Sequence, residues 1–245
     1  MELINLTEFN DLLSRAAEQN NVNVAVENCE RLFSFLELLL SENEKYNLTA
    51  IKQPADAVYK HIIDSILLAE HLPKGVSVVD VGCGAGFPSL PLAVVRPDLR
   101  ITSMDSTAKK VNFIQMCVDR LGLGNVRPVC GRAEELAFRP EFRDKFDVAT
   151  ARAVANLPVL CELCLPFVKP NGHFMAMKGR YPAEEFNISA EALAKLSAEG
   201  MKIREYELAT PDSGEQRTLV TITKIGKTKD NFPRKYSVIT KNPLK

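Results

Sequence analysis

The fold follows from one stretch of the sequence, Val78-Val79-Asp80-Val81-Gly82-Cys83-Gly84-Ala85-Gly86-Phe87-Pro88. A run of β-forming residues ends at an acidic residue, and glycine then occupies every second position. Glycine has no Cβ, so a turn built from it can adopt positive φ and leave its main chain open to a ligand. The stretch therefore predicts a buried parallel strand, a tight ligand-binding turn and a helix beginning just beyond it.

The spacing of these glycines separates two kinds of ligand. Dinucleotide-dependent oxidoreductases use G-x-G-x-x-G, in which the third glycine allows helix–strand packing and the helix N-terminus holds a pyrophosphate. Here the pattern is D-x-G-x-G-x-G, followed by Phe87 and Pro88. It resembles the turns in which S-adenosylmethionine, a ligand without phosphate, binds a Rossmann-like sheet. A nucleotide-dependent oxidoreductase is the alternative that this spacing disfavours.

A second acid supports a ligand that contains a nucleoside. The segment 100–105 is predicted to be the next strand and ends at Asp105. In a doubly wound sheet, an acid at this strand end can accept hydrogen bonds from both ribose hydroxyls of an adenosine. We therefore place Asp105 and its neighbour Ser106 in the predicted cofactor site. The alternative role for Asp105 is to cap the helix that follows.

Strands and helices alternate through most of the chain, which predicts an α/β fold with a mostly parallel sheet covered on both faces. Residues 1–72 are expected to form an N-terminal helical appendage, residues 73–225 the sheet domain, and residues 226–245 a basic tail that is loosely ordered in isolation. The expected helices cover residues 22–46, 54–71, 108–121, 157–168 and 183–200. The expected strands cover residues 76–81, 101–105, 126–130, 146–151 and 172–178, followed by an antiparallel pair at 203–208 and 217–225.

Bulk composition disfavours several classes of protein. The chain has 245 residues, of which 46% are hydrophobic, so it can bury a large core. We expect no membrane span, because no apolar run reaches 18 residues, and no secretory signal. Six scattered cysteines are typical of reduced thiols in a cytoplasmic protein. Cys161 and Cys164 have C-x-x-C spacing but no second pair nearby, so zinc or redox chemistry is disfavoured and we expect no metal.

Charge is distributed unevenly along a chain whose net charge is zero. Residues 1–72 carry five basic and twelve acidic residues, whereas the tail, 226–245, carries six basic residues and one acid. A chain with this asymmetry could meet RNA with one face and keep an acidic face in solvent. The alternative is that these charges only solvate the surface. We expect a monomer.

Two further strand ends carry candidate site residues, because ligands in such sheets bind at the carboxyl ends of the strands. Glu134 follows the third expected strand, where it could hydrogen-bond an adenine; alternatively it is an acid favoured by a helix dipole. Arg152 follows the fourth strand, where a methyl acceptor must approach. Its guanidinium could bind a carboxylate through bidentate hydrogen bonds or steer an RNA phosphate. The alternative is a surface salt bridge.

Several segments together resemble the bacterial glucose-inhibited division protein B family, also called the small-subunit ribosomal RNA methyltransferase G family. The resemblance rests on the stretch 80–92 together with Arg96-Pro97-Asp98, Asp105-Ser106, Arg132-Ala133-Glu134-Glu135, Ala151-Arg152-Ala153, Tyr46-Asn47-Leu48-Thr49-Ala50-Ile51, His61-Ile62-Ile63-Asp64-Ser65 and Phe232-Pro233-Arg234-Lys235. It covers nearly the whole chain. The tail departs from the family pattern at Tyr236-Ser237-Val238-Ile239-Thr240.

The resemblance implies a Rossmann-like class I S-adenosylmethionine-dependent methyltransferase that modifies N7 of a guanine in 16S ribosomal RNA of the small subunit. The family's cofactor positions correspond to Gly82, Phe87, Ala133, Glu134 and Arg152 in this sequence. With the acids and glycines argued above, the predicted cofactor-binding set is Gly82, Gly84, Gly86, Phe87, Asp105, Ser106, Ala133, Glu134 and Arg152. Arg152 is also the predicted catalytic residue.

The absence of two motifs typical of other nucleic-acid methyltransferases agrees with the implied chemistry. Guanine N7 carries a free lone pair, so its methylation needs positioning rather than a general base. After the fourth strand the sequence has neither the Asn/Asp-Pro-Pro-aromatic motif of exocyclic-amine methyltransferases nor the cysteine nucleophile of cytosine-C5 enzymes. N7 lies in the deep groove of A-form RNA, so the target should be an unpaired or extruded guanine.

Candidate substrate contacts are basic residues near the site and in the tail. For the RNA backbone they are Arg152, Lys178, Arg180, Lys227, Lys229, Arg234 and Lys235, and for shaping the acceptor pocket they are Asn47 and His61. Solvated loop charges remain the alternative for Lys178 and Arg180, and a helix-face histidine the alternative for His61. Two other functions stay open: a methyltransferase acting on a small molecule or protein, and a non-catalytic RNA-binding module.

Overall fold

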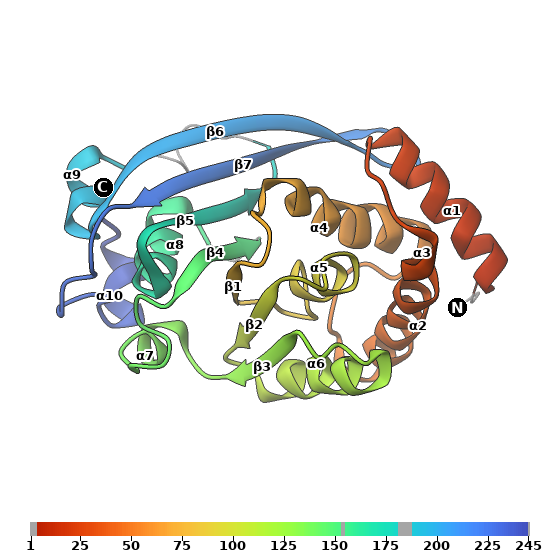
Figure 1. The fold of residues 1–245 in the computed structure, drawn as a ribbon, viewed down its shortest axis with the longest axis horizontal. Coiled ribbons are helices and arrows are strands. Elements are labelled where there is room, and N and C mark those ends of the chain that lie inside the picture. The colour runs from red at the N-terminus through yellow and green to blue at the C-terminus, as the bar shows by residue number, and fades with distance from the viewer. Residues whose placement is uncertain (1–3, 153–154, 181–187, 245) are drawn as a thin grey trace.

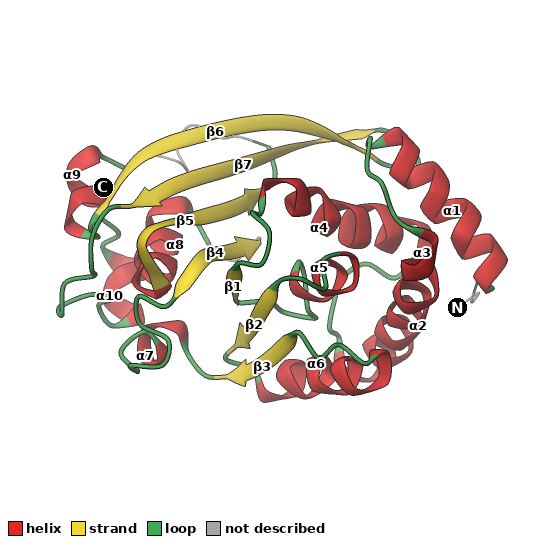
Figure 2. Ribbon diagram, viewed as in Figure 1, coloured by secondary structure: helices red, strands yellow, loops and turns green. Residues whose placement is uncertain are grey.

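A seven-stranded sheet forms the centre of the molecule in the computed structural model, which describes residues 4–152, 155–180 and 188–244 (Figures 1 and 2). The strand order is β3-β2-β1-β4-β5-β7-β6. The strands are β1 (Ser77–Val81), β2 (Arg100–Asp105), β3 (Val126–Cys130), β4 (Phe146–Arg152), β5 (Val168–Lys178), β6 (Ala198–Ala209) and β7 (Gly214–Lys224). Strands β1 to β5 are parallel, and β7 pairs antiparallel with both β5 and β6. The predicted Rossmann-like fold is confirmed.

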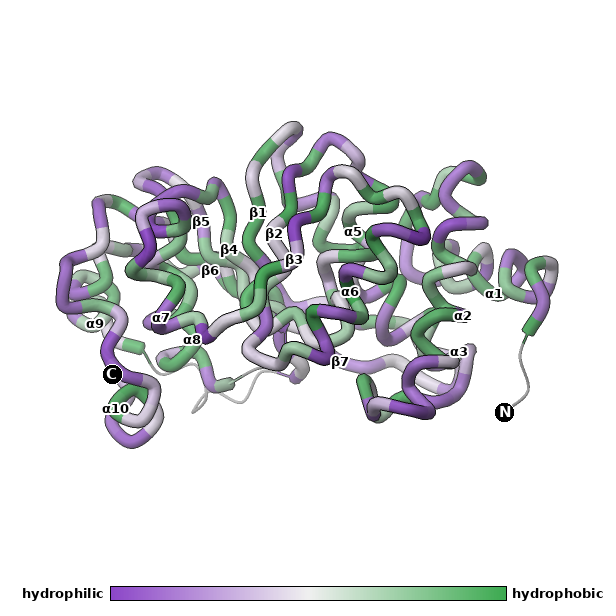
Figure 3. The backbone as a smooth tube through the Cα atoms, turned by 90° about the horizontal axis from the view of Figure 1, so that it is seen from below, coloured by the Kyte–Doolittle hydropathy of each residue, from purple (hydrophilic) through white to green (hydrophobic). Residues whose placement is uncertain are grey.

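Helices cover both faces of the sheet. They are α1 (Leu6–Gln19), α2 (Cys29–Tyr46), α3 (Pro54–Ala57), α4 (Asp64–Ile66), α5 (Ser89–Val95), α6 (Ala108–Leu121), α7 (Ala133–Leu136), α8 (Leu157–Cys164), α9 (Ala190–Lys195) and α10 (Tyr236–Lys241). A π-helical segment, Val58–Ile63, joins α3 to α4, and 3₁₀ turns cover Val26–Asn28, Leu67–His71 and Leu165–Phe167. Helices α1 and α10 lie at opposite ends of the molecule (Figures 1 and 3).

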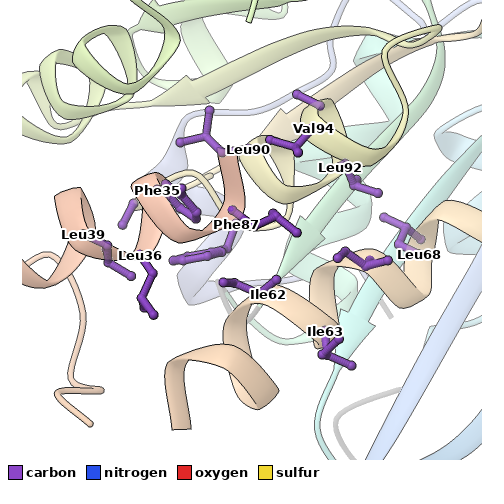
Figure 4. Packing of buried hydrophobic residues seen from close by; sticks show 14 of the residues in the cluster. Phe35, Leu36, Leu39, Ile62, Ile63, Leu68, Phe87, Leu90, Leu92 and Val94 are labelled. Atoms are coloured by element: carbon purple, nitrogen blue, oxygen red, sulfur yellow. The ribbon is translucent and has the colours of Figure 1, made fainter. Parts of the chain in front are cut away.

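Alternation along each strand sends side chains into two apolar layers. Val78 of β1 belongs to the layer that α1 to α6 cover, whereas its neighbour Val79 belongs to the layer under α7 to α10. The N-terminal helices share the first layer with α5, so their apolar faces are buried against the sheet domain. Figure 4 shows this packing, in which Phe35 of α2 meets Phe87 with ring centroids 5.3 Å apart.

The switch in strand order explains where a ligand can bind. From β1 the chain proceeds to β2 and β3 on one side, and then returns to β4 on the other side of β1. A crevice opens at such a switch point, outside the carboxyl ends of the two central strands. Gly82 follows β1 and Arg152 ends β4, so both candidate residues stand at this crevice.

The prediction of one helix over residues 183–200 is wrong at its C-terminal end, where α9 (Ala190–Lys195) stops and β6 begins at Ala198. Residues 183–187 lie outside the described part of the chain, α9 is only six residues long, and β6 begins at Ala198. The cause is local backbone geometry: Ser197 and Gly200 adopt φ of 55° and 62°, which a helix cannot continue through. Likewise, the helix expected over 157–168 ends at Cys164, and residues 22–25 precede the first helical turn of their segment.

The described part of the C-terminal tail, up to residue 244, packs against α8. Its residue Arg234 donates from Nε and from the backbone N–H to Glu162 Oε1, both at 2.8 Å, and from Nη2 to Oε2 at 2.6 Å. Glu162 lies on α8 and is fully buried. The same guanidinium donates to the carbonyl of Asn242 and so closes the segment that contains α10. The pairing gives Arg234 a structural role, and its contact with RNA stays a prediction.

Removal of this anchor is expected to destabilise the protein substantially. Arg234→Met leaves the buried Glu162 carboxylate without its cation, which costs about 3 kcal/mol of unfolding free energy. Urea denaturation measures the loss. Lys235→Met, one residue along and exposed, is the matched control and should change the unfolding free energy by less than about 0.5 kcal/mol. Equal effects of the two variants would contradict the anchoring role.

No helix in the described part of the chain is long and apolar enough to cross a membrane.

Candidate active site at the carboxyl ends of the strands

The carboxyl ends of β1 to β4 surround a cavity of about 510 Å³, which we call the first cavity. Seven of the nine residues predicted to bind the cofactor line it: Gly82, Gly84, Asp105, Ser106, Ala133, Glu134 and Arg152. These residues come from four separate loops of the sequence. The parallel sheet brings the loops to one edge, as the strand-end argument requires.

The glycine turn is shaped by φ angles that other residues rarely adopt. Gly82, Gly84 and Gly86 have φ of 74°, 59° and 90°. A Cβ built on Gly84 would meet no atom within 4 Å, and Gly84 lines the first cavity. Gly86 does not line the cavity: a Cβ on it would collide with the side chain of Leu90 at the start of α5. One glycine thus exposes main chain to a ligand, whereas the other allows the helix to pack.

Asp105 connects the turn to the neighbouring strand end. Its Oδ2 accepts a hydrogen bond from the N–H of Gly84 at 3.1 Å, and its Oδ1 accepts one from the N–H of Thr107 at 2.8 Å. The second bond goes to Thr107, which is the N-cap of α6, so Asp105 supports the approach to this helix but does not cap it. The carboxylate still lines the first cavity, with Lys110 Nζ 3.7 Å from Oδ2.

Asp80, the acid before the turn, is structural. It is fully buried, and its Oδ2 accepts a hydrogen bond from the N–H of Ser89 at 3.2 Å, where α5 begins. Burial raises the pKa of its carboxyl group to about 7. Asp80, at the end of β1, therefore links that strand to the start of α5 and stabilises the glycine turn between them.

Arg152 closes one end of the first cavity and is held by three different elements. Its Nη1 donates to the carbonyl of Lys60 at 3.0 Å and to Asp64 Oδ2 at 3.2 Å. Its Nη2 donates to His61 Nδ1 at 3.0 Å. The guanidinium carbon also lies 4.9 Å from the ring centroid of Phe87, a cation–π contact. Arg152 is thus a nearly buried cation in a fixed position, not the surface salt bridge weighed as its alternative.

His61 and Phe87 form a stacked pair beneath this arginine. Their ring centroids are 4.3 Å apart with an interplanar angle of 24°. Since Arg152 can only donate, Nδ1 of His61 must accept, and the proton therefore sits on Nε2, which lies 2.7 Å from Thr49 Oγ1. Burial and the neighbouring guanidinium lower the pKa of His61 to about 3, so the ring is neutral at physiological pH. Phe87 does not line the first cavity; it supports Arg152 from the side.

A second cavity of about 310 Å³ lies on the other side of Arg152. Its lining consists of Ile51, Lys60, His61, Asp64, Arg152, Met177, Lys178, Gly179, Glu215 and Arg217. Arg152 lines both cavities. Two carboxylates and several cations meet here: Arg217 lies 3.1 Å from Asp64 and 3.0 Å from Glu215, and Lys60 lies 3.0 Å from Glu215.

The sequence reasoning missed most of this second cavity. Of its polar residues, only His61, Arg152 and Lys178 were candidates. Asp64 lies within a quoted motif but was given no role, and Glu215 and Arg217 carry no local signal because they start an antiparallel strand. Tyr236 was also missed as a site residue: it lines the first cavity from the ordered tail, next to a groove that contains Phe138.

Of the other candidates, Lys178 lines the second cavity and the rest lie apart from both cavities. Asn47 is exposed and terminates α2 with φ of 50°, so it does not line the acceptor side. Lys178 is nearly buried and donates to the carbonyl of Ala155 at 2.7 Å. Arg180, Lys227, Lys229 and Lys235 are exposed and line neither cavity.

The cysteine pair of α8 packs in the core. Cys161 and Cys164 are fully buried, and burial raises the pKa of both thiols. Within residues 4–152, 155–180 and 188–244, no group of three or more His, Cys, Asp or Glu side chains is arranged to hold a metal ion.

Comparison with solved structures identifies the fold. TYW2 from M. jannaschii, solved in complex with AdoMet, superposes with a TM-score of 0.52 at 15% identity, covering 67% of this chain and 76% of that chain. The [4+2]-cyclase SpnF superposes with a TM-score of 0.54 at 17% identity, covering 82% and 97%. The fold is that of the class I S-adenosylmethionine-dependent methyltransferases. Because a cyclase shares it, the fold alone does not fix the reaction.

Comparison of sequences is more specific. A family model described as rRNA small subunit methyltransferase G matches residues 28–216. A curated protein from Clostridium perfringens, named Ribosomal RNA small subunit methyltransferase G, is 41% identical over 97% of this chain and 100% of its own length. The motifs around the glycine turn, Asp105 and Arg152 had pointed to the same family. This chain belongs to the rRNA small subunit methyltransferase G family.

Proposed function

We propose that this protein transfers a methyl group from S-adenosylmethionine to N7 of an unpaired guanine in 16S ribosomal RNA of the small subunit. The observation that carries the proposal is the pair of cavities that share Arg152 at the switch point of the sheet. The first cavity receives the methyl donor and the second receives the base. In-line transfer needs N7 in contact with the methyl carbon, so donor and acceptor would meet beside Arg152, which borders both cavities.

The first cavity has the features that this cofactor requires. Gly84 leaves space where any other residue would project a Cβ, so the methionine end can lie against main chain. Asp105 has lone pairs left to accept hydrogen bonds from ribose hydroxyls, because each of its oxygens accepts one bond from a backbone N–H. Ala133 and Glu134 line the opposite side, near the place expected for the adenine. Arg152 lies where it can bind the carboxylate of the methionine part.

S-adenosylmethionine supplies an electrophilic methyl group on a positively charged sulfur. The protein's own task is positioning, because N7 of guanine needs no deprotonation. His61 suits this role: it is neutral, and both of its ring nitrogens are engaged by Arg152 and Thr49. The reaction therefore calls for neither a general base nor a metal ion.

The substrate is recognised by charge as well as by shape. Lys60, Lys178 and Arg217 line the second cavity, and the exposed lysines of the tail add positive charge elsewhere. Phosphate contacts release counterions, so affinity for rRNA should fall steeply between low and moderate salt. A small-molecule or protein substrate would give flat salt dependence. We place the reaction in the cytoplasm and expect a single chain to suffice, since described residues of one chain line both cavities.

The decisive experiment uses ribosomal RNA and small subunits from bacteria that lack this activity. Incubation with the protein and S-adenosylmethionine should produce 7-methylguanosine at one position of the 16S RNA, mapped by nuclease digestion. Calorimetry should show binding of S-adenosylhomocysteine to the same preparation. Binding of NAD without binding of S-adenosylhomocysteine would overturn the proposal.

Asp105→Ala is expected to weaken S-adenosylhomocysteine binding by tenfold to about a hundredfold, since hydrogen bonds to a charged acceptor are lost. The dissociation constant is measured by calorimetry. Asp119→Ala removes an exposed acid on α6 that bonds only Gln115 in the described structure, and it should leave the constant unchanged. An Asp105→Ala variant that binds like wild type would show that this acid only supports α6.

A further inference from the structure

The second cavity contains two carboxylates, which differ in how fully the neighbouring cations cover them. Asp64 is nearly buried, and each of its oxygens accepts from an arginine: Oδ1 from Arg217 Nε at 3.1 Å, and Oδ2 from Arg152 Nη1 at 3.2 Å. The two guanidinium groups therefore cover this acid. Asp64 fixes the arginines and is poorly placed to meet a ligand.

Glu215 is the other carboxylate, at the start of β7, with 38% of its side chain exposed. Its Oε1 lies 3.0 Å from Lys60 Nζ, and its Oε2 lies 3.0 Å from Arg217 Nη1. A carboxylate has about four lone-pair sites, so each oxygen keeps one for a further donor. The two cations lower the pKa of Glu215 and keep it ionised.

With Glu215 included, the charges of this cluster balance: Lys60, Arg152 and Arg217 face the acids Asp56, Asp64 and Glu215. Lys60 also pairs with Asp56 at 3.0 Å, and Arg217 also pairs with Asp64. Glu215 is thus held between two cations, each of which also contacts a second acid. Such an arrangement orients a carboxylate firmly while leaving its outward lone pairs toward the cavity that it lines.

Guanine presents a matching pair of donors. When N7 faces the methyl donor, the base's opposite edge carries N1–H and the N2 amine side by side. Adenine offers a lone pair at N1 and has no amine at C2, so a carboxylate there would face an acceptor. We propose that Glu215 selects guanine by accepting hydrogen bonds from N1–H and from the N2 amine, with Lys60 and Arg217 holding it in register. The proposal rests on the function proposed above and names the residue that reads the base.

The test is a double-mutant cycle between the protein and the RNA. Once the methylated guanine is mapped, two 16S RNA molecules are assembled by ligation, one with guanine and one with inosine at that position. Inosine lacks only the N2 amine. Wild type should methylate the inosine RNA with kcat/KM lower by tenfold to about a hundredfold, the effect of losing a hydrogen bond to a charged group. Glu215→Ala should be slow on guanine and show no difference between the two RNAs.

A structural role for Glu215 gives a different pattern. In that case Glu215→Ala lowers the rate on both RNAs and keeps the full inosine penalty, which overturns the proposal. Glu207→Ala removes an exposed acid from the paired strand β6, outside the second cavity, and should retain wild-type discrimination. Calorimetry with S-adenosylhomocysteine confirms that each variant is folded.

A second substitution covers the case in which the alanine variant fails to fold. Glu215→Gln keeps the shape and one acceptor but points an amide N–H₂ at one donor of the base, so its inosine penalty should fall well below the wild-type value. An unchanged penalty in this variant also overturns the proposal. Failure of wild type to methylate the guanine RNA is a separate result, which refutes the proposed function itself.

Discussion

Arg152→Met is expected to lower kcat/KM for rRNA methylation by about a thousandfold, the size of effect seen when a preorganised charged donor is removed from a reaction centre. The side chain is the one shared by the two cavities, and it contacts Lys60, His61, Asp64 and Phe87 at once. Without it, the place where the two cavities adjoin loses a fixed positive charge that would orient donor and acceptor. Single-turnover methylation of unmethylated 16S RNA measures the loss.

The matched variant is Arg152→Lys. A lysine keeps the charge but has neither the planar fork that reaches Asp64 and His61 together nor the flat face that lies over Phe87, so activity should stay close to that of Arg152→Met. Full activity of the lysine variant would show that only charge matters here. Arg152→Met should also lower the unfolding free energy by about 3 kcal/mol, because Asp64 stays buried with one cation fewer.

Loss of stability has to be separated from loss of catalysis. Adding Asp64→Asn to Arg152→Met removes the uncompensated buried charge and should restore part of the unfolding free energy in urea. Activity should not return. If the double variant recovers both stability and activity, Arg152 acts only by holding the fold, and the assignment of a catalytic role is wrong.

The first cavity could be foreseen because its residues follow strands directly. The residues from Val78 to Val81 predict a buried parallel strand, and the glycines after them predict a turn with exposed main chain. Asp105 and Arg152 stand at the ends of the next predicted strands, and parallel strands place such ends along one edge of the sheet. Local sequence therefore determined both the elements and the positions of these side chains.

The second cavity could not be foreseen in the same way. Lys60 and Asp64 come from the N-terminal helices, whereas Glu215 and Arg217 begin an antiparallel strand some 150 residues later. Ion pairs between such distant segments depend on how the N-terminal helices pack on the sheet, and periodicity does not report that packing. The same holds for the tail, where a short polar segment is ordered by one buried glutamate on α8.

Gly84→Ala and Gly86→Ala each add one methyl group to the same turn, but they are expected to have different effects. Gly84→Ala should lose ligand binding, and Gly86→Ala should lose stability. At Gly84 the added methyl meets no protein atom within 4 Å and enters the first cavity. The positive φ costs about 1 kcal/mol of stability, so the protein folds. The dissociation constant for S-adenosylhomocysteine should rise by a hundredfold or more, because the methyl occupies space that the ligand needs.

At Gly86 the added methyl would overlap the side chain of Leu90, a residue of α5 that is fully buried. Overpacking of this kind, with φ of 90° in addition, should cost about 3 kcal/mol of unfolding free energy. Urea denaturation and calorimetry on the two variants separate the effects: Gly84→Ala stable and unable to bind, Gly86→Ala unstable yet able to bind while it is folded. If Gly84→Ala binds normally, the ligand does not lie against this main chain, and the first cavity is not the cofactor site.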